Sequence, residues 1–118
     1  MTKHCTLKQS QAMKEIGFDM PVRDYYIGND IKLGTTLVNW NNNLTSAPTH
    51  AEALDWFREK KGIDGWVMPM LKELNGYLFC YEGPESTETY TSRSYPTHPE
   101  ATSSLVDKCI EITKKQKP

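Results

Sequence analysis

The chain has 118 residues, which is the length of one domain, and we expect that domain to span residues 1–118 with frayed ends at 1–5 and 114–118. A composition of 37% hydrophobic and 25% charged residues is typical of a soluble globular protein and argues against a disordered or membrane-embedded chain. The 14 basic and 15 acidic residues give a net charge of −1, so no strong overall field favours DNA, RNA or an anionic membrane.

The N-terminal residues lack the apolar segment of a secretory signal, and no run approaches the roughly 18 apolar residues of a membrane span. We therefore expect a cytoplasmic protein. Cys5, Cys80 and Cys109 are odd in number and far apart in the chain. In a reducing compartment they are expected to be free thiols, and the last two lie in apolar patterns that predict burial.

The first helix is predicted from its two ends. Thr6 and Gln9 have the spacing of a capping box, in which each residue's side chain satisfies a free amide at the helix start. Gly17 followed by Phe18 is typical of a Schellman ending. The helix is therefore expected over residues 7–16, with a narrow apolar stripe that packs against the rest of the domain.

The next part of the chain predicts an irregular hairpin. Residues 25–27 and 36–40 have the β-branched and aromatic content of strands. Turn residues at 28–30 and at Gly34 separate them. A polar loop then leads to Pro48, which is compatible with a following helix only near its start.

Two further helices begin with the same pattern, Ser-x-Pro-Thr-His-x-Glu-Ala, at residues 46–53 and 94–101. Its Thr and Glu have capping-box spacing. The first copy predicts a helix over about residues 51–61, ended by Gly62, and the second predicts one over 97–113 with a long apolar stripe. Because the hairpins upstream do not superpose at the same offset, we favour a shared type of cap over an internal duplication.

A second hairpin is predicted between the last two helices. Residues 66–71 and 77–81 flank Asn75-Gly76, the dipeptide that best suits a type I′ turn. An edge strand is expected around residues 89–93. The predicted fold is α+β: one antiparallel sheet of about four strands in two hairpins, with three helices in the order α-ββ-α-ββ-α, packed mainly on one face.

Residues for catalysis or metal binding form no strong pattern. The cysteines and histidines lack metal-site spacing, so we expect no metal, no cofactor and no catalytic residue that can be assigned. His50 and His98 lie just inside helix starts, where side chains usually point to solvent, and a small hydrolase using one of them is a distant candidate. A base can activate a neighbouring thiol, and His4 lies next to Cys5 in the sequence. Nothing in the sequence, however, holds that end of the chain in place.

Aromatic residues in two polar loops are arranged as interface anchors often are. Trp40 lies in the first loop, and Tyr90, Arg93 and Tyr95 lie in the second. We take these four residues as the candidate interaction surface, against the equally weighted alternative that each aromatic ring packs on a helix. An exposed edge strand is another means of recruiting a partner.

The second functional candidate is a weak nucleic-acid binder. Aromatic side chains on a sheet face can stack on bases. Tyr77, Phe79 and Tyr81 share one face of the second hairpin, and Trp66 lies in the other strand. Since three helices need a surface to pack on, that shared face is more suited to the core, and without a basic excess nucleic acid is not favoured.

The order of these parts resembles a known group of proteins. It begins with Ile-Gly-Phe-Asp at residues 16–19 and Tyr25-Tyr26, and continues with the capped helix at 46–60 and with residues 95–101 before the last helix. This arrangement resembles small uncharacterised proteins encoded by bacteriophages, prophages and mobile elements of gut bacteria. The resemblance implies an accessory function in a bacterial cytoplasm and supplies no catalytic residues. We expect a non-enzymatic interaction module with an unidentified host or element protein as partner, and a homo-oligomer is compatible with the sequence.

Overall fold

The computed structural model describes residues 4–70, 76–83 and 89–116. Its described part has an α+β fold, with three α-helices and two three-stranded antiparallel sheets, so the predicted fold class is confirmed. The elements in chain order are α1 (Leu7–Glu15), β1 (Tyr25–Ile27), β2 (Asp30–Lys32), the 3₁₀ turn η1 (Trp40–Asn42), β3 (Thr45–Ser46), α2 (His50–Trp56), the π-helical turn η2 (Phe57–Lys61), β4 (Asp64–Pro69), β5 (Tyr77–Glu82), β6 (Thr89–Thr91) and α3 (His98–Gln116).

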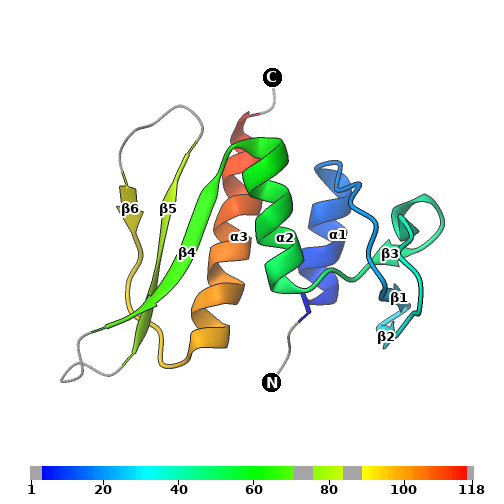
Figure 1. The fold of residues 1–118 in the computed structure, drawn as a ribbon, viewed down its shortest axis with the longest axis horizontal. Helices are drawn as coiled ribbons and strands as arrows, with labels where there is room; N and C mark the ends of the chain where they lie inside the picture. The colour runs from blue at the N-terminus through cyan, green and yellow to red at the C-terminus, as the bar shows by residue number, and fades with distance from the viewer. Residues whose placement is uncertain (1–3, 71–75, 84–88, 117–118) are drawn as a thin grey trace.

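The prediction of one sheet of about four strands is wrong. One sheet has the strand order β2-β1-β3 and the other has β4-β5-β6. Figure 1 shows them at opposite ends of the molecule, with the three helices between them. The helices separate the sheets because α3 contacts β4 and β5 on one side and α1 and α2 on the other, while α1 also contacts β3.

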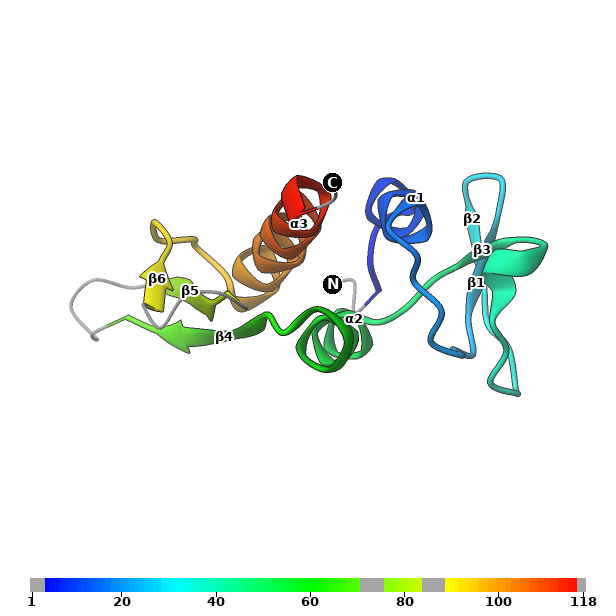
Figure 2. The same cartoon turned by 90° about the horizontal axis from the view of Figure 1, so that it is seen from above.

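The β4-β5-β6 sheet has one covered face. Seen from above, α3 lies over one side of this sheet, and no described element lies over the other (Figure 2). Trp66 and Met68 are partly exposed on β4. The molecule is flattened as a result, with extents of 45 × 35 × 20 Å. No described helix is both long and apolar enough to cross a bilayer.

The first hairpin pairs different residues from those predicted. Ile27 lies opposite Asp30 across the two-residue turn Gly28-Asn29. The predicted partner, residues 36–40, contributes only an isolated bridge at Val38. Gly28 has a φ of 59°, which suits the first position of a primed hairpin turn. The local turn thus set the pairing, although the β-branched content of 36–40 is higher than that of β2.

The second hairpin is confirmed, with six residues in each of β4 and β5, and β6 forms the predicted edge strand. Of the predicted turn Asn75-Gly76, Gly76 alone is among the described residues. The Met70 N–H donates to the Gly76 carbonyl at 2.9 Å, so Gly76 ends the ladder. Residues 71–75, including Asn75, lie outside the described residues.

The predicted helix starts are confirmed by their caps. Thr6 and Thr49 each form a complete capping box. Thr97 Oγ1 accepts a hydrogen bond from the Glu100 N–H at 3.3 Å at the start of α3. These bonds satisfy amides that would otherwise have no partner in the first turn. α1 ends in the predicted Schellman motif, in which Gly17 has a φ of 93°.

The end of the second helix differs from that pattern. α2 passes into η2, where the Gly62 N–H donates to the Phe57 carbonyl over five residues. The Ile63 N–H donates to the same carbonyl at 3.1 Å. Phe57 and Ile63, at the two ends of this wider turn, are both fully buried. No local sequence signal predicts the π turn.

A single apolar cluster joins the three helices to β5. It includes the following buried residues: Cys5, Met13, Ile16, Phe18, Val22, Ala53, Trp56, Phe57, Ile63, Phe79, Leu105, Val106, Cys109 and Ile110. Gly65 of β4 lies close to Leu105 of α3. A Cβ atom placed there would lie 2.8 Å from Leu105 Cδ1.

Candidate binding surface

The side of the β4-β5-β6 sheet that faces α3 carries five aromatic residues. β5 places Tyr77, Phe79 and Tyr81 on one face because alternate residues of a strand point the same way. Phe79 belongs to the core, which identifies this as the α3 side. Tyr90 of β6 lies opposite Tyr81, and Tyr95 lies opposite Tyr77 in an isolated bridge. We call these five residues the aromatic row.

Four of the five rings of the aromatic row contact one another, in two stacked pairs. Tyr90 is nearly parallel to Tyr81, with a centroid distance of 5.2 Å and an angle of 20°. Tyr95 is nearly parallel to Phe79, at 6.0 Å and 22°. Phe79 and Tyr81 are 6.3 Å apart, which links the two pairs. β5 therefore supports the rings that come from β6 and from the segment after it.

Burial decreases outward along the aromatic row. Phe79 is buried, Tyr81 and Tyr95 are half-buried, and 44% of Tyr90 is exposed. A ring that is fixed on one side and exposed on the other offers apolar area to a ligand at a small cost in side-chain entropy. The outer end of the row is therefore suited to binding.

A guanidinium group lies beside the row. The Arg93 carbon Cζ is 4.6 Å from the centroid of the Tyr95 ring, within the range of a cation–π contact. Arg93 is exposed, and among the described residues it forms no ion pair. At the other end of the row, the exposed His98 ring meets Tyr77 edge-on at 5.5 Å.

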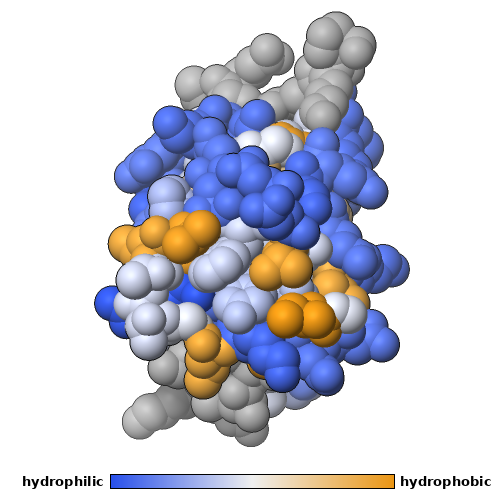
Figure 3. Space-filling view, turned by 90° about the vertical axis from the view of Figure 1, so that its right-hand side faces the viewer, coloured by the Kyte–Doolittle hydropathy of each residue, from blue (hydrophilic) through white to orange (hydrophobic). Residues whose placement is uncertain are grey.

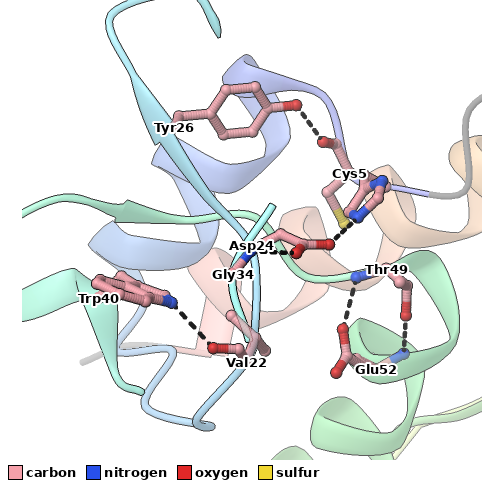
Figure 4. Close-up of polar contacts among 9 residues, drawn as sticks. Cys5, Val22, Asp24, Tyr26, Gly34, Trp40, Thr49 and Glu52 are labelled. Carbon is pink, nitrogen blue, oxygen red and sulfur yellow. Dashed lines mark hydrogen bonds and ion pairs between the residues drawn. The ribbon is translucent and has the colours of Figure 1, made fainter. Parts of the chain in front are cut away.

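The structure places the four predicted surface residues in two separate regions. Tyr90, Arg93 and Tyr95 come together at the outer sheet edge. Trp40 lies at the opposite end of the molecule, where its Nε1–H donates to the Val22 carbonyl at 2.9 Å (Figure 4). Its ring also packs on Tyr25, at a centroid distance of 4.3 Å. Trp40 is half-buried and holds the first sheet to the core.

A polar cluster that the sequence did not indicate fixes the start of the chain. His4 Nε2 lies 2.5 Å from Asp24 Oδ2, and Asp24 Oδ1 accepts a bond from the Gly34 N–H at 3.1 Å (Figure 4). The Cys5 carbonyl accepts a bond from the Tyr26 hydroxyl at 2.7 Å. His4 and Asp24 are 20 residues apart, so no local spacing pattern could reveal their contact.

The same surroundings make Cys5 a weak nucleophile. All three cysteines are buried free thiols. Burial raises the pKa of Cys5 to about 12, with further increases from the negative charges of Asp107 and Glu52. Burial alone raises the pKa of Cys109 to about 12. Because the thiolate is the reactive form, both sulfurs remain protonated and unreactive at neutral pH.

Of the two histidines at helix starts, His98 is exposed as expected, whereas His50 differs from expectation. His50 was expected to point to solvent, but only 8% of it is exposed, and its Nε2 has no hydrogen-bond partner among the described residues. Burial lowers the pKa of His50, partly offset by Asp107, and His4 lowers it further. His50 is therefore neutral at pH 7. No group of three or more potential metal ligands converges in the described part of the chain.

A groove of about 320 Å³ lies between α1 and α3. The Gln9 side-chain amide spans it, donating to the Ser103 carbonyl, to Ser103 Oγ and to Asp107 Oδ1, each at 3.0 Å. These groups satisfy one another and join the two helices. The groove is thus a packing seam, and the aromatic row with Arg93 is the better candidate for ligand binding.

Comparisons with known proteins do not assign a function to this surface, so its assignment rests on the geometry of the chain. No family model matches the chain, and neither a curated protein nor a solved structure matches it. The candidate surface offers flat apolar rings and one cation that has no carboxylate partner in the described residues. Such a surface can pack against apolar side chains, hold a carboxylate or stack on bases.

Proposed function

We propose that this protein is a non-enzymatic interaction module that binds a partner protein through the outer end of the aromatic row and Arg93. The observation that carries the proposal is the stacking of Tyr90 on Tyr81 beside Arg93 on Tyr95, at the free edge of a sheet. Tyr and Arg are among the residue types that contribute most to binding energy at protein interfaces. Their contacts within the chain also hold the side chains in place before a partner arrives.

A protein partner fits the charge of this surface better than a nucleic acid does. Binding to a phosphate backbone needs several cations, whereas Arg93 is the cation that contacts the row. The chain as a whole has a net charge of −1. A partner segment with apolar side chains against Tyr90 and one carboxylate for Arg93 satisfies both parts of the surface. Weak binding of a single strand by base stacking is the second candidate.

The setting that we propose is the cytoplasm of a bacterium, with the gene carried by a bacteriophage, prophage or mobile element. The support is the resemblance of the sequence to small proteins of that origin. A hydrolase remains the least favoured candidate, because burial raises the pKa of Cys5 and Cys109 and because His50 is itself buried away from solvent. The raised pKa values keep these two thiols protonated, and a buried histidine has little access to a substrate.

The test is affinity capture from an extract of the bacterium that carries the gene, with each eluate examined for proteins and for nuclease-sensitive absorbance. Tyr90→Ser and Arg93→Glu change the proposed surface. Arg23→Glu is the matched control, because Arg23 is also exposed and lies near the other sheet. Urea unfolding of each variant checks that the fold is retained.

We expect one stoichiometric protein to survive nuclease treatment, to be lost with Tyr90→Ser and Arg93→Glu, and to be retained with Arg23→Glu. Equal capture by all variants would show that the partner binds elsewhere. Capture of nucleic acid alone, released by salt, would replace the proposal with the second candidate.

A further inference from the structure

The outer strand of the first sheet, β2, is a free edge. The sheet order is β2-β1-β3, so within the described residues only β1 pairs with β2. Figure 1 shows β2 at the lower margin of this sheet, with no element beside its outer side. All three residues of β2 are exposed. A free edge presents unpaired N–H and C=O groups to which another strand can bind.

The hairpin geometry shows which backbone groups point outward. Because the turn has two residues, Ile27 and Asp30 form a hydrogen-bonded pair, and the pairs alternate along the hairpin. Tyr26 opposite Ile31 is therefore a non-hydrogen-bonded pair. It follows that the N–H and C=O of Ile31 face away from β1, toward the free edge.

We propose that a second copy of this chain pairs with β2, antiparallel and centred on Ile31. Ile31 then faces Ile31 of the second copy, and two reciprocal backbone hydrogen bonds form between them. Asp30 faces Lys32 of the second copy, and Lys32 faces its Asp30. These are non-hydrogen-bonded positions, where cross-strand side chains are closest. The interface is self-complementary, as a two-fold dimer requires.

The charges on β2 favour this register over its neighbours. If one copy shifts by two residues along the strand, the outward-facing N–H and C=O groups of the two copies can still bond to each other. The shift nevertheless places Asp30 opposite Asp30 of the second copy, or Lys32 opposite Lys32. Like charges directly opposite each other are destabilising. If one copy shifts by one residue, the outward-facing backbone groups of one copy lie opposite residues whose backbone groups face inward, and the hydrogen bonds between the copies are lost. Among these registers, only the one centred on Ile31 combines the bonds with opposite charges.

The surrounding surface supplies apolar area for the second copy. Five of the eight large exposed hydrophobic residues in the described chain lie between residues 27 and 38: Ile27, Ile31, Leu33, Leu37 and Val38. Leu33 is 76% exposed and Leu37 62%. Figure 3 shows apolar residues among polar ones at this end of the molecule. Removing such side chains from water favours association.

The test uses charge reversal on β2 and analytical ultracentrifugation over a range of protein concentrations. Asp30→Lys and Lys32→Asp each create two like-charge pairs across the proposed interface, so each variant should weaken dimerisation about tenfold or more. The double variant, Asp30→Lys with Lys32→Asp, should dimerise as the wild type does. Lys60→Asp, on the exposed side of η2, is the matched control and should leave dimerisation unchanged.

A mixture of the two single variants gives the sharpest result, because the interface between the two different chains regains both opposite-charge pairs. We expect the mixture to form a mixed dimer at concentrations where each variant alone is monomeric. A wild-type chain that stays monomeric at every concentration would overturn the proposal. So would single variants that dimerise like the wild type, or a mixture that stays monomeric. Partner capture through Tyr90 and Arg93 should be the same for Asp30→Lys, which separates this proposal from the proposed function.

Discussion

Replacing Gly65 with alanine tests how closely β4 lies against α3. The added Cβ would lie 2.8 Å from Leu105 Cδ1, 3.1 Å from Cδ2 and 3.3 Å from Cγ. Leu105 is fully buried, so its side chain cannot move into solvent to make room. Adding a methyl group to a packed core costs about 1–3 kcal/mol. Gly→Ala also restricts the unfolded chain, which returns about 0.4–1 kcal/mol, so the net loss of unfolding free energy should be roughly 0–2.6 kcal/mol.

The assay is urea unfolding followed by tryptophan fluorescence, with the slope of the transition compared between variants. Gly83→Ala is the matched control, because no described atom lies within 4 Å of the corresponding Cβ. Its unfolding free energy should be unchanged or higher by up to about 1 kcal/mol.

A double-mutant cycle locates the clash. Leu105→Val removes both Cδ atoms that Gly65→Ala would meet. In that background, Gly65→Ala should cost at least about 0.5 kcal/mol less than in the wild type, the coupling expected for side chains in contact. An equal cost of Gly65→Ala in both backgrounds would refute the close approach of β4 to α3.

Three further predictions concern the buried titratable groups. The thiols should react with a disulfide reagent far more slowly in the native protein than in urea, since all three are buried, and a rapidly labelled native thiol would contradict their burial. Because burial raises the pKa of Cys5 and Cys109 from 9.0 to about 12, the unfolded chain loses these protons first, and the unfolding free energy should fall as pH rises above about 9. Burial lowers the pKa of His50 from 6.5, so the unfolded chain gains that proton first and the unfolding free energy should fall as pH drops below about 6.5. His50→Gln should reduce this dependence of the unfolding free energy on acid pH, and His98→Gln, at an exposed site, should not. Equal pH dependence in the two variants would show that other groups cause the loss of stability.

The sequence determined the features whose partners lie within a few residues. The capping boxes at Thr6 and Thr49 and the stop at Gly17 join groups three to five residues apart, so residue spacing was enough to predict them. The edge strand near Tyr90 and the shared face of Tyr77, Phe79 and Tyr81 followed from strand periodicity. The region of Tyr90, Arg93 and Tyr95 could be proposed from its composition alone.

Only the tertiary structure decided how these parts meet. The pairing of β1 with β3, the His4–Asp24 contact, the burial of His50 and the inward position of Trp40 depend on residues brought together from distant parts of the chain or from different elements. The stacking of Tyr90 on Tyr81 required the β5–β6 register. Local spacing fixes local hydrogen bonds, whereas these contacts exist because three helices and two sheets bury their apolar faces on one another. The division into two sheets places β2 at an edge, where β1 is its only paired strand in the described part of the chain.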